Sequence, residues 1–197
     1  MRAFVGLGAV LLALSGTMVV AAVPAGAVAK RCTTGTWKLT RAEHRTSRPG
    51  DLFWATTRGG AGERLKITGA GSLTYDFGRA AKNVTTGTLG GRKYTGWVRY
   101  RGKLKVKATL SGSRIRTRIK SASGGATYRI VVSAPSVFDS ASRNLAPKIR
   151  SGDSDQVVAA AGTFTCRGRT LKISETDSYA AAQGGGGVVS TWAYRRV

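Results

Sequence analysis

The chain has 197 residues, and its 32 Lys and Arg against 9 Asp and Glu give a formal net charge of +23 at pH 7. This length suits one ordinary domain. With 1 His and 2 Cys, the chain lacks the ligands for a zinc site built on its cysteines. Its lone His44 lies in no pattern typical of a Ser-His-Asp triad. We therefore expect a protein that is not an enzyme and that has no metal and no cofactor.

Residues 1–29 have the layout of a secretory signal peptide. An apolar run over residues 4–23 is followed by the small-x-small pattern Ala27-Val28-Ala29, an order typical of cleaved signals. The alternative is a retained membrane anchor, because the run is about long enough to span a bilayer. We expect cleavage, which leaves a single domain at residues 30–197 that is secreted or associated with the cell envelope.

Cys32 and Cys166 lie near opposite ends of this domain. In an oxidising compartment an even pair of cysteines predicts a disulfide. Two free buried thiols are the alternative. A bond that closes so long a loop stabilises a domain by on the order of 4–5 kcal/mol in the chain-entropy model.

Apolar and polar residues alternate repeatedly through the rest of the chain, with glycine-rich turns between the segments, which is typical of short antiparallel strands. The pattern predicts strands at Gly35–Thr40, Leu52–Thr57, Arg64–Thr68, Ser72–Phe77, Val84–Thr88, Lys93–Tyr100, Leu104–Leu110, Arg114–Lys120, Thr127–Val132, Ala160–Cys166, Thr170–Ser174 and Val188–Arg195. Residues 135–156 lack the alternation, so we expect one long loop near one end of the fold, with a helical turn around residues 137–145. Strands at both termini favour an all-β, antiparallel up-and-down β-barrel, since closure removes the exposed sheet edges.

The register of residues 93–120 follows from two predicted turns. A three-residue loop at residues 101–103 pairs Tyr100 with Leu104, and a turn at Gly112-Ser113 pairs Leu110 with Ile115. The same register pairs Val98 with Val106 and Val106 with Ile119, which leaves one apolar face. This face is either ordinary core or the wall of a pocket for a small apolar molecule. The candidate interior residues are Phe77, Tyr94, Val98, Tyr100, Leu104 and Ile119.

The opposite face of these strands is cationic, and residues 92–120 contain no Asp or Glu. The predicted register sets Lys107 against Arg118, and it sets Lys105 against both Arg99 and Lys120. Like charges directly across a ladder are destabilising, so an anionic cell-wall polymer or lipid explains the face better than stability does. Solubility alone is the alternative, and export leaves no intracellular nucleic acid as a partner. The candidate polyanion-binding residues are Lys93, Trp97, Arg99, Lys105, Lys107, Arg116, Arg118 and Lys120, where Trp97 either stacks on a neighbouring cation or is a stacking platform.

Gly35-Thr36-Trp37 and the late pair Arg195-Arg196 resemble motifs of the lipocalin-like (calycin) barrels. Residues 162–171 look like a hairpin of exported lipocalin-like proteins of actinobacterial type. In the lipocalin-like family a Gly-x-Trp motif lies in the first strand and a late Arg packs over the Trp. The resemblance implies that Trp37 lies on the barrel floor with Arg195 as its cover, and that the barrel holds a small apolar ligand. An avidin-like opening is the alternative.

Two functions follow from these patterns. In the first, the chain is a secreted, monomeric, non-enzymatic β-barrel that binds a small apolar molecule in its interior. In the second, it is an envelope-associated protein that binds anionic polymers or lipids through its basic outer face.

Overall fold

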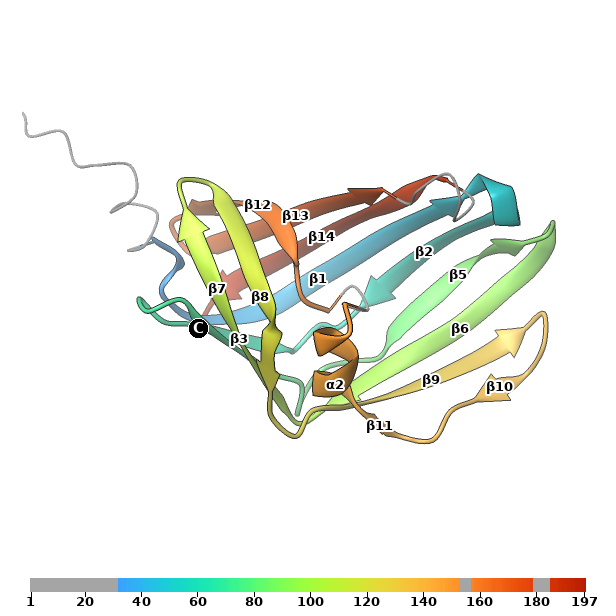
Figure 1. Cartoon of the computed structure of the whole chain (residues 1–197), viewed down its shortest axis with the longest axis horizontal. Coiled ribbons are helices and arrows are strands. Elements are labelled where there is room, and N and C mark those ends of the chain that lie inside the picture. Colours follow the sequence, from blue (N-terminus) through green and yellow to red (C-terminus); the bar gives the residue numbers. More distant parts are fainter. Residues whose placement is uncertain (1–31, 153–156, 179–184) are drawn as a thin grey trace, which may run out of the picture.

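The computed structural model describes residues 32–152, 157–178 and 185–197, which form an antiparallel β-structure (Figure 1). The signal peptide predicted at residues 1–29 and the last residues of the loop predicted at 135–156 lie outside the described residues. The strands are β1 (Gly35–Arg48), β2 (Phe53–Gly59), β3 (Arg64–Ile67), β4 (Ser72–Asp76), β5 (Asn83–Leu89), β6 (Arg92–Arg101), β7 (Lys103–Ser111), β8 (Arg114–Ser123), β9 (Thr127–Ala134), β10 (Phe138–Asp139), β11 (Arg143–Asn144), β12 (Ala161–Arg167), β13 (Thr170–Ser178) and β14 (Gly187–Arg196). The helices are η1 (Pro49–Asp51) and α2 (Leu145–Arg150). Among the described residues no helix is long and apolar enough to cross a bilayer.

Eight strands close an antiparallel barrel, which confirms the predicted fold class. Around the barrel the order is β1, β3, β4, β7, β8, β12, β13 and β14, and β14 pairs with β1 to complete the circle. Each predicted strand overlaps an observed one, but β1 continues beyond the predicted end at Thr40 to Arg48.

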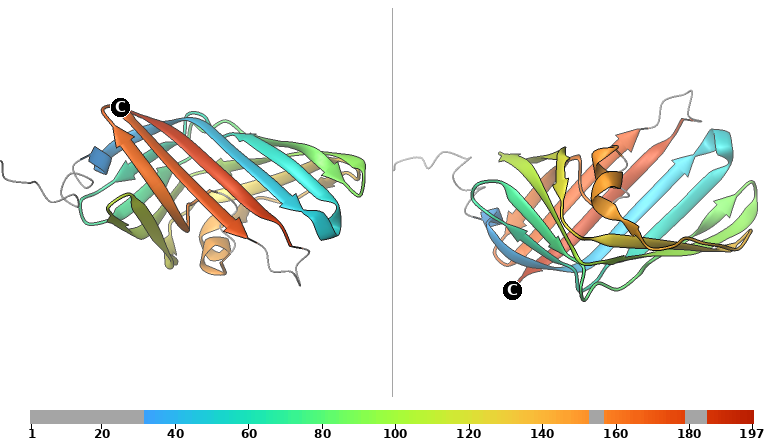
Figure 2. Two further views of the ribbon diagram at one scale, coloured as in Figure 1. Left: turned by 90° about the horizontal axis from the view of Figure 1, so that it is seen from above. Right: turned by 60° about the horizontal axis from the view of Figure 1, so that its bottom comes forward.

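The remaining long strands extend the barrel wall beyond the closed circle. They are β2, β5, β6 and β9, and each is next in sequence to one of the barrel strands β3, β4, β7 and β8. Starting from the second half of β1, they pair in the order β2, β5, β6 and β9. The meander therefore consists of long strands with short interruptions, such as the single residue Gly102 between β6 and β7. The far edge of β9 pairs with the short β10 and β11, so in the described residues this half of the wall does not close onto β13 (Figure 2).

The hairpin predicted at residues 101–103 is wrong. β6 and β7 follow one another along one line, and Tyr100 pairs with Tyr128 while Leu104 pairs with Tyr75. Arg99 accordingly lies opposite Arg129 and not Lys105. Alternation alone cannot separate the two arrangements, because both place the even-numbered residues of this segment on the same face.

The predicted turn at Gly112-Ser113 is confirmed, with Leu110 opposite Ile115 and Lys107 opposite Arg118. Beyond this point the register shifts, and Lys105 pairs with Ser123. The pairs predicted for Lys105 with Lys120 and for Val106 with Ile119 are therefore wrong. Ser121 fills the irregularity, since its Oγ accepts a bond of 2.7 Å from the Lys107 backbone N–H.

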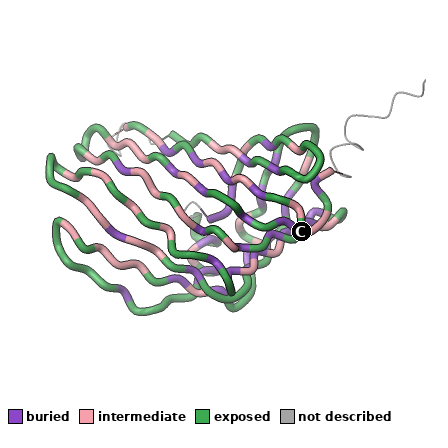
Figure 3. The backbone as a smooth tube through the Cα atoms, turned by 180° about the vertical axis from the view of Figure 1, so that it is seen from behind, coloured by how far each residue is buried: buried purple, intermediate pink, exposed green. Residues whose placement is uncertain are grey.

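The closed half of the barrel is filled with side chains, and Figure 3 shows buried positions gathered toward the end near the C-terminus. Fully buried residues there include Trp37, Leu65, Tyr75, Phe77 and Leu104. The burial of these apolar side chains stabilises the fold.

Helix α2 packs against β8 and β9 at the side where the wall is open. Its Leu145 and Ile149 are buried, and the Asn144 side chain caps its start by accepting a 3.0 Å bond from the Ala146 backbone N–H. The helical turn predicted around residues 137–145 is wrong, because this cap sets the helix start at Leu145.

The floor of the barrel joins the two ends of the domain. The predicted disulfide between Cys32 and Cys166 is confirmed. Trp37 is buried and its Nε1 donates to the Thr33 carbonyl at 2.7 Å. The guanidinium of Arg196, not of Arg195, lies over the Trp37 ring at 4.7 Å from its centroid. Arg196 pairs directly with Trp37 and so shares its face, whereas Arg195 alternates to the exposed outer face.

Candidate functional site: a cavity in the open half of the barrel

A cavity of about 620 Å³ occupies the half of the barrel that the core leaves unfilled. Residues of β1, β2, β5, β6, β9, β13 and β14 line it. Its volume is in the range of small-molecule sites in proteins. The lining includes His44, Thr46, Arg48, Phe53, Ala55, Thr57, Asn83, Thr85, Tyr94, Gly96, Val98, Tyr100, Ile130, Glu175, Asp177, Val188 and Ser190.

A row of polar side chains crosses the wall of this cavity. Directly paired residues run from Glu175 through Ser190, His44 and Thr57 to Thr85. The Oγ1 atoms of the two threonines lie 2.8 Å apart in a hydrogen bond. Residues paired across neighbouring strands share one face, so the row presents its polar groups together to the cavity.

The inner face of the barrel thus changes from apolar to polar along the barrel. On β13 the inward positions Leu171 and Ile173 are buried in the core, and the next two inward positions are Glu175 and Asp177. On β14 the buried Trp192 is followed, toward the open half, by Ser190. The same alternation that fills one half with apolar groups therefore builds a polar wall in the other half.

His44 is the most enclosed polar group of the wall, with 4% of its surface exposed. Its ring meets the Trp192 ring edge to face at 5.2 Å between centroids. Burial lowers the pKa of His44 to about 4, so the ring is neutral at pH 7. Its Nδ1 and the Oδ1 of Asn83 are buried atoms without a hydrogen-bond partner among the described residues. Buried polar atoms are normally hydrogen-bonded, so both atoms are suited to a bound molecule.

The rest of the lining includes aromatic and aliphatic side chains. Phe53 and Tyr94 meet edge to face at 5.4 Å between ring centroids, and Val98, Tyr100 and Ile130 also line the cavity. Of the predicted interior residues, Tyr94, Val98 and Tyr100 lie in this wall. Phe77 and Leu104 lie instead in the packed core of the closed half, and Ile119 is partly buried against that core.

Sequence reasoning missed the polar residues of the wall. His44 lies beyond the predicted end of the first strand, and Glu175 and Asp177 lie beyond the predicted end of the strand at Thr170–Ser174. The period-2 pattern continues through these residues, but with polar side chains at the inward positions. An alternation of apolar and polar residues was therefore no longer visible.

The predicted cationic residues lie on the outer surface. Because β6 and β7 continue one line, their odd-numbered residues keep one outward face on both sides of Gly102. We call the exposed cations on this outward face of β6 and β7, together with those of β8, the basic stripe: Lys93, Arg99, Arg101, Lys103, Lys105, Lys107, Arg114, Arg116, Arg118 and Lys120. Trp97 is half-buried on β6 and is also among the residues that line the cavity. Lys82 Nζ lies 5.4 Å from its ring centroid, which is a local cation–π contact.

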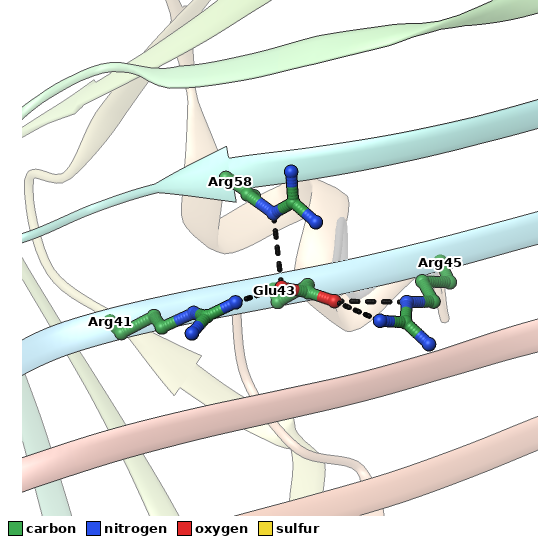
Figure 4. A network of polar contacts seen from close by, with 4 residues as sticks. All are labelled: Arg41, Glu43, Arg45 and Arg58. Carbon is green, nitrogen blue, oxygen red and sulfur yellow. Dashed lines mark hydrogen bonds and ion pairs between the residues drawn. The ribbon is translucent and has the colours of Figure 1, made fainter.

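A second cationic group surrounds Glu43 on the outer face of β1 and β2 (Figure 4). The Glu43 carboxylate accepts bonds from Arg58 at 3.0 Å, from Arg41 at 2.5 Å and from Arg45 at 2.9 Å. These bonds, that of Arg58 first, lower the pKa of Glu43 to about 2. The carboxylate thus neutralises part of a cluster that would otherwise repel itself.

Glu63 is a buried carboxyl group between β2 and β3, with 6% of its surface exposed. The Tyr194 hydroxyl donates to its Oε1 at 3.2 Å. Burial raises the pKa of Glu63 to about 8, so the group is mostly protonated in the folded protein at pH 7. This residue belongs to the closed half and does not line the cavity.

No protein-family model, no curated protein and no solved structure matches the chain. Among the described residues, no group of three His, Cys, Asp or Glu side chains lies close enough together to hold a metal ion. The class that the geometry itself defines is an antiparallel β-barrel, filled at one end and hollow at the other.

Proposed function

We propose that the chain is an exported, non-enzymatic binding protein of lipocalin-like type that holds a small molecule in the open half of its barrel. The observation that carries the proposal is the cavity of about 620 Å³ with a wall both aromatic and polar. The disulfide supports export to an oxidising compartment. The contact of Arg196 with Trp37 supports the lipocalin-like resemblance.

The lining favours a ligand that is not wholly apolar. Phe53, Tyr94 and Val98 offer an apolar surface, but His44 and Glu175 line the same cavity. A wholly apolar ligand would leave such groups desolvated without hydrogen bonds, which is costly. The small apolar molecule expected from the sequence is therefore better replaced by one with an apolar body and polar groups.

Two matched variants and a neutral fluorescent dye, Nile red, test this proposal. Val98→Trp adds bulk at the cavity wall, whereas Val84→Trp adds the same bulk at an exposed position of the neighbouring strand. We expect Val98→Trp to weaken binding of the dye by about tenfold or more, a loss of about 1.4 kcal/mol, and Val84→Trp to leave it unchanged. Equal binding by both variants would show that the dye does not enter the cavity and would contradict the proposal.

The basic stripe favours a second function, retention on an anionic polymer or lipid of the cell envelope. Its cations are all exposed, and Lys107 lies directly opposite Arg118. We expect Lys105→Gln, Lys107→Gln and Arg118→Gln together to leave the melting temperature equal or higher, since they remove like-charge repulsion. The same changes should reduce the salt dependence of heparin binding by roughly 0.7–0.9 in log–log slope for each anionic group that the protein no longer neutralises.

The control triple neutralises three exposed cations outside the basic stripe, Arg167 on β12, Lys172 on β13 and Arg195 on β14. An equal change of slope in both triples would mean that net charge, and not the basic stripe, retains the protein. A marked loss of stability in the first triple would contradict the outward placement of its cations.

A further inference from the structure

The net charge of the side chains that line the cavity is opposite in sign to the net charge of the whole chain. The chain carries a net charge of +23, yet β13 presents two carboxylates, Glu175 and Asp177, to the cavity. Arg48 is the cation among the described lining residues, and its guanidinium lies 5.3 Å from the Phe53 ring centroid.

The other carboxylates whose side chains the structure describes have their partners within the protein. Glu43 is held by three arginines, Asp139 pairs with Arg129, and Asp76 lies 3.7 Å from Lys103. Glu63 is buried against Tyr194.

Glu175 and Asp177 have no ion pair within the described part of the chain. Glu175 Oε1 accepts a 2.8 Å bond from the Ala161 backbone N–H, and Asp177 Oδ1 accepts a 2.9 Å bond from the Ser178 backbone N–H. Each carboxylate has more acceptor sites than these bonds occupy. In so basic a chain, two cavity-facing carboxylates whose charge is not matched by a described cation are suited to a cation from outside.

Buried polar groups elsewhere in the cavity lining point to the same chemistry. His44 and Glu175 both pair with Ser190, so they lie two strands apart in the cross-strand row. The buried Nδ1 of His44 has no hydrogen-bond partner among the described residues, which is a second, independent sign of a bound polar group. Asn83 Oδ1, on β5 at the other end of the row, is a further buried atom of the lining without a partner among the described residues. A protonated amine offers up to three donors to acceptors of this kind. Phe53, Tyr94 and Val98 then provide the surface for an apolar or aromatic body.

We propose that the ligand of the cavity is a small amphipathic cation, with an aromatic or aliphatic body against Phe53, Tyr94 and Val98 and a protonated amine at Glu175 and Asp177. This inference rests on the proposed binding function and names its ligand class. The Glu175 carboxylate is partly buried in the wall, whereas Asp177 is exposed at the cavity edge of the same strand. An ammonium group between them restores both charge balance and hydrogen bonds. The positive charge of the outer surface slows the entry of such a ligand. It does not weaken an ion pair at hydrogen-bond distance inside the cavity, because salt screens the outer charges over about 8 Å at physiological ionic strength.

Three probes with one ring and different head groups test the inference: phenethylamine, phenethyl alcohol and hydrocinnamate. Titration calorimetry of the disulfide-bonded protein at physiological salt gives the three affinities. We expect the amine to bind about tenfold more tightly than the alcohol, and hydrocinnamate to bind least tightly. Glu175→Gln with Asp177→Asn should remove the preference for the amine and leave the affinity for the alcohol unchanged. The control pair Asp76→Asn with Asp139→Asn makes the same change of net charge on the outer surface and should leave the preference intact.

Each other outcome decides against one of the two proposals. Equal binding of amine and alcohol, or a preference that survives the double variant, overturns the inference while the binding function stands. Tightest binding of hydrocinnamate overturns it as well. Binding of none of the three contradicts the binding function itself. If Glu175→Gln unfolds the start of β12, Asp177→Asn alone should still lower the preference about threefold, because its carboxylate is exposed and bonds to its own neighbour.

Discussion

Glu63 gives the sharpest test of how dry the closed half of the barrel is. Its carboxyl group is buried, its Oε1 accepts from the Tyr194 hydroxyl, and burial raises its pKa from 4.5 to about 8. In the unfolded chain the same group ionises near its ordinary pKa. Between these two values the folded protein therefore holds a proton that the unfolded chain has released. The contribution of Glu63 to the free energy of unfolding is therefore largest at acidic pH, and it falls as the pH rises toward 8.

The size of the effect follows from the two pKa values of Glu63. Each pH unit inside the interval changes the free energy of unfolding by about 1.4 kcal/mol. From pH 5 to pH 7 the protein should therefore lose about 3 kcal/mol relative to Glu63→Gln, which carries no titratable group. His44 acts in the opposite direction, because its pKa falls from 6.5 to about 4 on folding and its contribution is lost as the pH falls. This second effect is present in both proteins and cancels in the comparison.

Urea unfolding of the disulfide-bonded protein at several pH values measures the difference. We expect Glu63→Gln to be more stable than the parent at pH 8 and close to it at pH 5. Glu43→Gln is the control, because the pKa of Glu43 is about 2 in the folded protein and its charge does not change in the folded state over this range. Parallel pH profiles for the parent and Glu63→Gln would show that Glu63 is ionised in the folded protein, and would refute the buried, dry environment.

Two further predictions concern the barrel floor. Arg196→Ala should destabilise the fold by roughly 2–3 kcal/mol in urea unfolding, since it removes the contact with Trp37 and two hydrogen bonds to backbone carbonyls, whereas Arg195→Ala should stay within about 0.5 kcal/mol of the parent. Equal effects would contradict the assignment of the cover to Arg196. Cys32→Ser should lower stability by up to about 5 kcal/mol, the chain-entropy value for a bond between residues 134 positions apart, and the parent treated with reductant should match it. If reduction leaves the unfolding midpoint of the parent unchanged, the bond does not hold the ends of the domain together.

Much of the fold could be predicted from local patterns in the sequence. Alternation and glycine-rich turns predicted strands that overlap the long strands of the barrel, and the cysteine pair predicted the disulfide. These features are readable because a half-buried strand must alternate, and because two thiols in an oxidising compartment pair. The short helix α2 was misplaced, since its start depends on the single cap at Asn144.

The partners of each strand were decided by the tertiary structure. Residues 93–111 alternate in the same way whether Gly102 reverses the chain or only interrupts it, so the pattern cannot tell a hairpin from one long strand. Pairing of β6 with β5 and β9, and of β7 with β4 and β8, makes the choice. The cavity follows from the same long-range pairing, because only the register brings Glu175, Ser190 and His44 into one row. Each of these residues is ordinary in its own strand, and they form a common wall only because the strands that carry them are neighbours in the folded sheet.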